Sequence, residues 1–187
     1  VSSHDFMKLT LSISLVVLTL SASAEYDPAR DTLIVETLIR LDKTNINDNE
    51  KLKSAVLRHL DANQGTERYL ELIQKFRITE RNDKLMAMVL DGSAGPLSVQ
   101  ALKIMLQRKV TKPIEDIFKG NDEDKKSALI RQLGFANLDE ARHLIGAFIT
   151  DKRNSTSFRS KAIEALGSTP KGQQVILDLV KADKLPS

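Results

Sequence analysis

The chain has 187 residues, and 28 basic residues against 25 acidic ones give a formal net charge of +3. It has no cysteine, which excludes disulfides, thiolate metal sites, cysteine nucleophiles and a Cys-x-x-Cys-His haem motif within these residues. Aromatic residues make up only 4% and Trp is absent, so a core of Leu, Ile, Val and Ala is expected, which favours helix pairs. A nucleic-acid surface needs clustered Lys and Arg, whereas the basic residues here are spread along the chain. We therefore expect an all-α protein that does not bind nucleic acid.

Residues 1–24 predict an export signal. A short basic region begins at Met7, a 12-residue apolar run follows, and small residues form an A-x-A cleavage site that ends at Ala24. The alternative is a membrane anchor, but a spanning helix needs about 20 apolar residues. We expect Met7 to be the start, with residues 1–6 as an upstream extension. Cleavage near Ala24 would then leave residues 25–187 as a helical repeat domain, exported to the periplasm or beyond, without a stable membrane span.

The first element of the mature chain is the strongly apolar segment 32–41, which fits either a buried strand or a helix. Because its apolar residues have helical spacing, we interpret it as a helix, followed by a polar loop at 42–49. The face expected to be buried consists of Leu33, Thr37, Leu38 and Leu41.

From Glu50 onward, apolar residues recur at i, i+3, i+4 and i+7, as in pairs of amphipathic helices. A first pair surrounds the break at 61–65, a shorter helix is expected at 83–90, and Pro96 and Pro113 begin the two helices of the next pair. A final pair breaks at Gly167. The predicted core residues of these helices are Leu52, Ala55, Val56, Leu60, Tyr69, Leu72, Ile73, Phe76, Ala101, Leu102, Met105, Leu106, Ile114, Ile117, Phe118, Phe158, Ala162, Ala165, Leu166, Val175, Ile176, Leu179 and Val180.

Residues 121–150 contain the most complete helix pair. Gly134 is placed to end the first helix, and Asn137 with Glu140 three residues later fits an N-cap with a carboxylate at N3. The apolar faces of the pair consist of Ala128, Leu129, Ile130, Leu133, Ala141, Leu144, Ile145 and Phe148.

The pairs recur at irregular intervals. A leucine closes the first helix of each pair, and the first interval between these leucines is the widest because it contains the extra short helix. The four leucines are Leu60, Leu106, Leu133 and Leu166. Two-helix units that bury their apolar stripes by stacking form an α-solenoid. The sequence therefore predicts an α-solenoid of HEAT-like antiparallel helix pairs.

The C-terminal part of the chain also resembles a known family. Residues 82–187, and most of all the run GQQVILDLVKADKLP at 172–186, are similar to the HEAT-like repeat region of secreted, planctomycete-type membrane-bound dehydrogenase and haem-binding (cytochrome c) proteins. In that family the repeats resemble a linker between a sugar-dehydrogenase-like propeller and a c-type cytochrome domain. Neither domain nor a Cys-x-x-Cys-His motif is present in these residues, so the haem function does not carry over.

Few residues suggest chemistry. Glu140 and His143 have the Glu-x-x-His spacing of di-metal bundles, but a working site needs a second such motif and further carboxylates. His59 has no matching catalytic partner and suits the C-terminal end of a helix. The acidic run 121–124 lacks the ligand spacing and the glycine of an EF-hand, so it is interpreted as a first helical turn. No catalytic residue, cofactor or metal site is predicted.

The one candidate binding site is a basic patch made of Lys103, Arg108, Lys109 and Lys112, which would suit an acidic partner or a lipid head group; the alternative is a solvated turn. The function that fits these patterns is a secreted, non-enzymatic helical scaffold that contacts another protein, such as a dehydrogenase or cytochrome c component. The alternative is a detached or truncated part of a haem-containing periplasmic dehydrogenase or electron-transfer system.

Overall fold

A computed structural model describes residues 27–92 and 95–185, so the predicted export signal lies outside the described residues. The described part is all-α and contains no β-strand, which confirms the all-α part of the prediction. No helix in it is both long and apolar enough to cross a membrane. The helices are α2 (Pro28–Arg40), α3 (Glu50–Ala62), α4 (Glu67–Lys75), α5 (Asn82–Leu90), α6 (Pro96–Gln107), α7 (Lys112–Lys119), α8 (Glu123–Ala136), α9 (Asp139–Thr150), α10 (Thr156–Gly167) and α11 (Pro170–Lys181).

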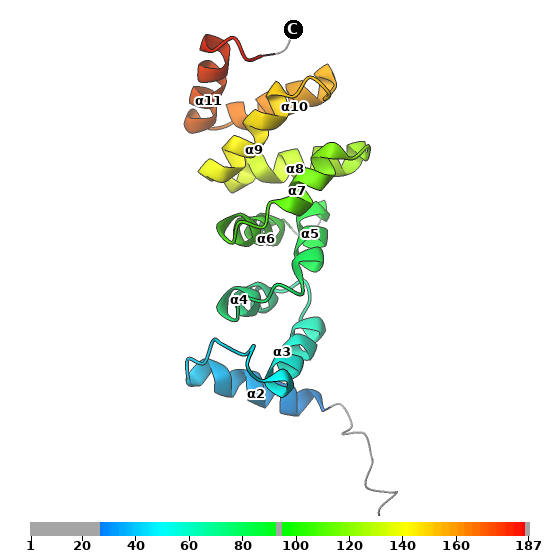
Figure 1. Cartoon of the computed structure of the whole chain (residues 1–187), viewed down its shortest axis with the longest axis vertical. Coiled ribbons are helices and arrows are strands. Elements are labelled where there is room, and N and C mark those ends of the chain that lie inside the picture. Colours follow the sequence, from blue (N-terminus) through cyan, green and yellow to red (C-terminus); the bar gives the residue numbers. More distant parts are fainter. Residues whose placement is uncertain (1–26, 93–94, 186–187) are drawn as a thin grey trace, which may run out of the picture.

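The helices follow one another along the long axis of the molecule, from α2 at one end to α11 at the other (Figure 1). Helices α3, α5, α8 and α10 form one side of the array, and α4, α6, α9 and α11 form the other (Figure 1). Packing joins neighbours in the chain, such as α5 with α6 and α10 with α11, and also successive members of one side, such as α8 with α10. The core therefore extends along the array.

The extra short helix is α7, whereas the sequence pattern assigned that role to the segment at 83–90. Helix α5 packs against α6 and forms a pair with it. Helix α7 packs instead against α8, and its Phe118 ring lies 4.6 Å, centroid to centroid, from the Phe148 ring of α9. Helices α5 and α7 have nine and eight residues, so their apolar patterns are too short to show which of them is the extra helix.

The junction between α8 and α9 also differs from the prediction. Helix α8 ends at Ala136, and Asn137 adopts the left-handed conformation with φ 50°, so Asn137 closes α8 and does not cap α9. Leu138 occupies the N-cap position of α9 without a side-chain hydrogen bond, and Asn137 Oδ1 accepts a hydrogen bond from Arg142 Nη1 at 2.8 Å. Gly134 lies inside α8. A Cβ there would be 3.2 Å from the Ala165 Cβ, so this glycine allows α8 and α10 to pack closely.

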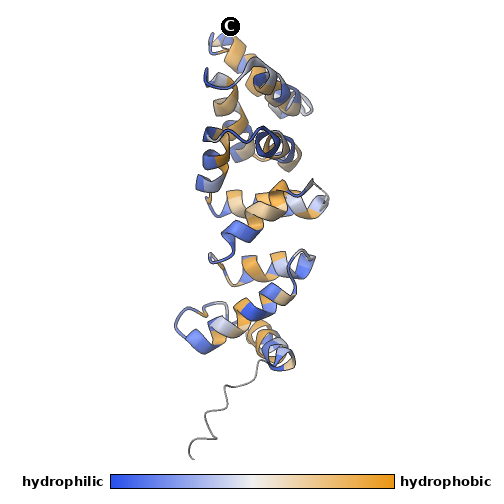
Figure 2. Ribbon diagram, turned by 90° about the vertical axis from the view of Figure 1, so that its right-hand side faces the viewer, coloured by the Kyte–Doolittle hydropathy of each residue, from blue (hydrophilic) through white to orange (hydrophobic). Residues whose placement is uncertain are grey.

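Most of the predicted apolar faces are buried, and each helix carries both hydrophobic and hydrophilic residues along its length (Figure 2). The prediction for α2 was wrong in part. Leu38 is buried as predicted, but Thr37 is exposed and Leu33 and Leu41 are both 68% exposed, whereas Asp31 and Val35 are buried. The prediction for α11 was also wrong in part. Its apolar residues are half-buried or exposed because α11 is the last described helix and packs mainly against α9 and α10.

Ion pairs join the helices of the N-terminal half. Asp31 of α2 accepts two hydrogen bonds of 2.8 Å from the guanidinium of Arg58 in α3, which explains how this carboxylate is buried. Lys53 of α3 lies 2.5 Å from Glu80, which belongs to the connection between α4 and α5. The hydrogen bond from Lys53 lowers the pKa of Glu80 from its ordinary value of 4.5 to about 2.

We expect these carboxylates to make the fold sensitive to acid. Because the pKa of Glu80 is depressed in the folded state, its contribution to stability is present above pH 4.5 and is lost as the pH falls toward 2. Urea denaturation at pH 7 and pH 2.5 should show that Glu80→Gln costs stability at the higher pH and little at the lower one. Equal costs at both values would contradict this assignment.

Candidate binding surface

The predicted basic patch is located where α6 ends and α7 begins. Arg108 is the C-cap of α6, Lys109 follows it with φ 58°, and Lys112 is the first residue of α7. Lys112 pairs with Asp116 one turn further along the same helix, at 3.3 Å. Arg108 lines a hollow whose lining does not include Lys103, Lys109 or Lys112.

This hollow, which we call the arginine hollow, has a volume of about 530 Å³ and lies between the C-terminal ends of α4 and α6. Five of its lining side chains can donate hydrogen bonds, two are aliphatic, and none is a carboxylate. The lining residues are Gln74, Arg77, Thr79, Ile104, Gln107, Arg108 and Val110.

The two helices that form the hollow end with the same turn. After α4, Arg77 adopts φ 53° and the amide of Ile78 donates to the carbonyl of Ile73 at 3.1 Å. After α6, Lys109 adopts φ 58° and Val110 repeats this hydrogen bond at 2.9 Å. This is the Schellman arrangement, which satisfies carbonyls that the last helical turn leaves free. Glycine is the usual residue at the left-handed position of this turn, so the arginine and the lysine found there do not indicate the turn in the sequence.

The guanidinium of Arg108 has few partners for a group that is only partly exposed. Its Nη2 donates a long hydrogen bond of 3.4 Å to the carbonyl of Arg77, and its buried Nη1 has no hydrogen-bond partner among the described residues. Burial lowers the pKa of Arg108, and the nearby charge of Glu80 opposes that shift. Glu80 itself is bound to Lys53.

Two other arginines with low exposure bind carboxylates. Arg81 holds Asp61 through two hydrogen bonds of 2.8 and 2.7 Å, and Arg142 pairs with Asp139. Arg108 thus differs from them in lacking an acidic partner within ion-pair distance among the described residues.

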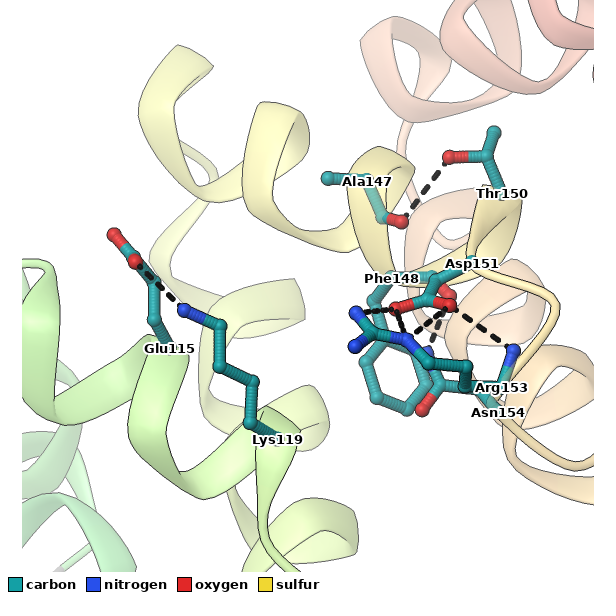
Figure 3. Close-up of polar contacts among 8 residues, drawn as sticks. All are labelled: Glu115, Lys119, Ala147, Phe148, Thr150, Asp151, Arg153 and Asn154. Atoms are coloured by element: carbon teal, nitrogen blue, oxygen red, sulfur yellow. Dashed lines mark hydrogen bonds and ion pairs between the residues drawn. The ribbon is translucent and has the colours of Figure 1, made fainter.

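A smaller hollow of about 140 Å³ lies between α7, the C-terminal part of α9 and the segment that follows α9. Its charged groups pair with one another: Lys119 lies 3.5 Å from Glu115, and Arg153 lies 2.6 Å from Asp151 (Figure 3). The hydrogen bond from Arg153 lowers the pKa of Asp151 to about 2. Because each acid already has a base beside it, this hollow offers no uncompensated charge to a ligand.

The histidines occupy separate places. His143 lines a hollow of about 410 Å³ together with Asp139 and Arg142, whereas Glu140 is not among the lining residues. His59 Nδ1 lies 3.3 Å from the Thr32 hydroxyl, and burial is the main cause that lowers the pKa of His59. Within the described ranges, no three His, Cys, Asp or Glu residues are close enough together to hold a metal ion.

The acidic run 121–124 begins a helix. Asp122 is the N-cap of α8, where its carboxylate accepts a hydrogen bond from the backbone amide of Lys125 at 3.0 Å and pairs with the Lys125 ammonium at 2.8 Å. The hydrogen bond from the Lys125 side chain is the main cause that lowers the pKa of Asp122. These contacts agree with the interpretation of the run as a first helical turn.

Comparison of the chain with protein-family models, with curated proteins and with solved structures found no significant match.

Proposed function

We propose that residues 25–187 form an α-solenoid of HEAT-like helix pairs and act as an exported, non-enzymatic scaffold that contacts another protein. The main support is the recurrence of the helix pairs. Helices α3, α5, α8 and α10 begin at Glu50, Asn82, Glu123 and Thr156, so the first and last intervals are nearly equal and the middle one is longer. The longer interval contains α7. Without it, the period would be close to that of a two-helix repeat.

The turns at the C-terminal ends of several helices repeat as well. Four helices are followed by a residue with a φ between 49° and 58°: Asp42 after α2, Arg77 after α4, Lys109 after α6 and Asp183 after α11. Of these helices, α4, α6 and α11 lie on the same side of the array (Figure 1). In all four turns the next residue donates its amide to a carbonyl five residues earlier. The first three turns follow one another at nearly equal intervals along the chain. Such recurrence of backbone detail favours a repeated unit over an irregular helical fold.

A stack of helix pairs leaves surface available for binding a partner. Each unit buries its apolar stripe against its neighbours, so the sides of the array stay open along its length. Large apolar side chains are exposed at its two described ends. They are Leu33 on α2, Leu41 directly after α2, and Leu177 and Val180 on α11. These residues provide contact area for a companion protein or domain.

Site-specific photocrosslinking in the native host tests the scaffold. A photoreactive residue at Gln107, on the rim of the arginine hollow, should give a discrete crosslinked product whose partner mass spectrometry identifies. The matched control is Lys51, an exposed residue of α3 on the other side of the array. Products of equal pattern and yield at both positions, or none at either, would contradict a partner bound to this surface.

A further inference from the structure

We propose that the arginine hollow binds the carboxylate of an acidic side chain or C-terminus, carried by the protein partner of the scaffold. The carboxylate would take its place against Arg108, between the C-terminal turns of α4 and α6. That a protein partner carries the carboxylate rests on the proposed function. That the hollow binds a carboxylate rests on the contacts within this chain.

The guanidinium of Arg108 lacks a counter-charge. A guanidinium that is partly removed from water costs free energy unless a carboxylate or several acceptors compensate it. Arg108 has one long hydrogen bond of 3.4 Å to the Arg77 carbonyl and a buried Nη1 without a partner among the described residues. The neighbouring acid, Glu80, is bound to Lys53 at 2.5 Å. The anion that would complete the site therefore has to come from outside the described residues.

The hydrogen-bond donors of the hollow suit a carboxylate. The planar guanidinium fork matches the two oxygens of a carboxylate, and paired charged hydrogen bonds of this kind are the strong ones. Arg77, Gln74, Gln107 and Thr79 add further donors around the same hollow, and Ile104 and Val110 provide an aliphatic wall for a side-chain stem. A volume of about 530 Å³ leaves room for a whole acidic side chain.

The negative ends of the two helices oppose an anion, but their effect is reduced here. A helix C-terminus carries roughly half a negative charge on its free carbonyls. The turns at Arg77 and Lys109 bind several of these carbonyls, including those of Ile73 and Met105. The full charges of the two arginines in the lining exceed these partial charges, and the lining contains no carboxylate.

Calorimetric titration at constant ionic strength tests the site. The probes are a short peptide rich in Glu and Asp, the same peptide with Gln and Asn, free succinate, and inorganic phosphate. The wild-type chain should bind the acidic peptide and not its amide counterpart. Arg108→Gln should weaken this binding about tenfold or more, because a charged hydrogen-bond pair is lost. Lys112→Gln removes the same charge outside the hollow and should stay within about twofold.

The unliganded stability of Arg108→Gln is the second readout, and circular dichroism first checks that it folds. Because the substitution removes an uncompensated charge, its melting temperature should equal or exceed that of the wild type. A large drop would make Arg108 a structural residue and overturn the proposal. Failure of this variant to fold counts as such a drop.

The remaining outcomes separate this proposal from the scaffold itself. Equal losses in Arg108→Gln and Lys112→Gln, or binding of phosphate alone, would overturn a carboxylate site. Succinate bound as tightly as the peptide would support the carboxylate chemistry and overturn the protein carrier. If no probe binds while crosslinking at Gln107 still captures one partner, the carboxylate site is contradicted and the scaffold function remains supported.

Discussion

Leu133→Ala is expected to lower the free energy of unfolding by about 2–5 kcal/mol, the range for buried Leu→Ala substitutions that leave a cavity. Leu133 is 1% exposed in α8, and α8 packs against α5, α6, α9 and α10. Because these helices surround α8 closely, a neighbouring helix would have to move to fill the lost volume. Urea denaturation followed by circular dichroism measures the effect.

Phe135→Ala is the matched control for this substitution. Phe135 is two residues further along α8 and is 64% exposed, so its truncation should cost less than about 1 kcal/mol although more atoms are removed. If Phe135→Ala costs as much as Leu133→Ala, the assignment of the core face of α8 is wrong.

Gly172→Ala is expected to destabilise the packing of α11 on α10 by about 3 kcal/mol, at the upper end of overpacking effects. A Cβ at Gly172 would lie 1.9 Å from the carbonyl oxygen of Leu166 and 2.7 Å from its carbonyl carbon, so one backbone has to move. Hydrogen exchange should show faster exchange in α11, with α3 to α6 little affected.

Gly146→Ala is the control for this glycine. A Cβ at Gly146, inside α9, would lie 3.8 Å from Val175 Cγ1, an ordinary contact. Since alanine has the higher helix propensity, this variant should be more stable by up to about 1 kcal/mol. The close approach at Gly172 would be contradicted if both variants changed stability in the same direction and by the same amount.

The helices and most of their buried faces could be predicted because apolar residues keep a clear helical period over most segments. Helix ends were less predictable. Asn137 followed by Glu140 fits an N-cap, but Asn also tolerates the left-handed conformation, and the structure uses it to close α8. Part of the buried face of α2 was missed, because Asp31 is buried through its pair with Arg58, a contact 27 residues away in the chain.

The candidate site could be predicted only in part. The cluster of basic residues pointed to Arg108, yet Lys103, Lys109 and Lys112 do not line the hollow. Its other arginine, Arg77, is 31 residues earlier, and only the packing of α4 beside α6 brings the two together. A polar residue followed by an aliphatic one, as in Arg77-Ile78 and Lys109-Val110, is the signal in the sequence that could have indicated the shared turn.

Small-angle X-ray scattering of the mature chain in solution tests most directly whether the helix pairs stack into an open array. A compact chain of this length would have a radius of gyration of about 15 Å. The proposed solenoid predicts a clearly larger value and a pair-distance distribution with a long tail, as expected from the extended arrangement in Figure 1. A radius of gyration no larger than that of the compact chain, with a symmetric distribution, would contradict the array and the scaffold that depends on it.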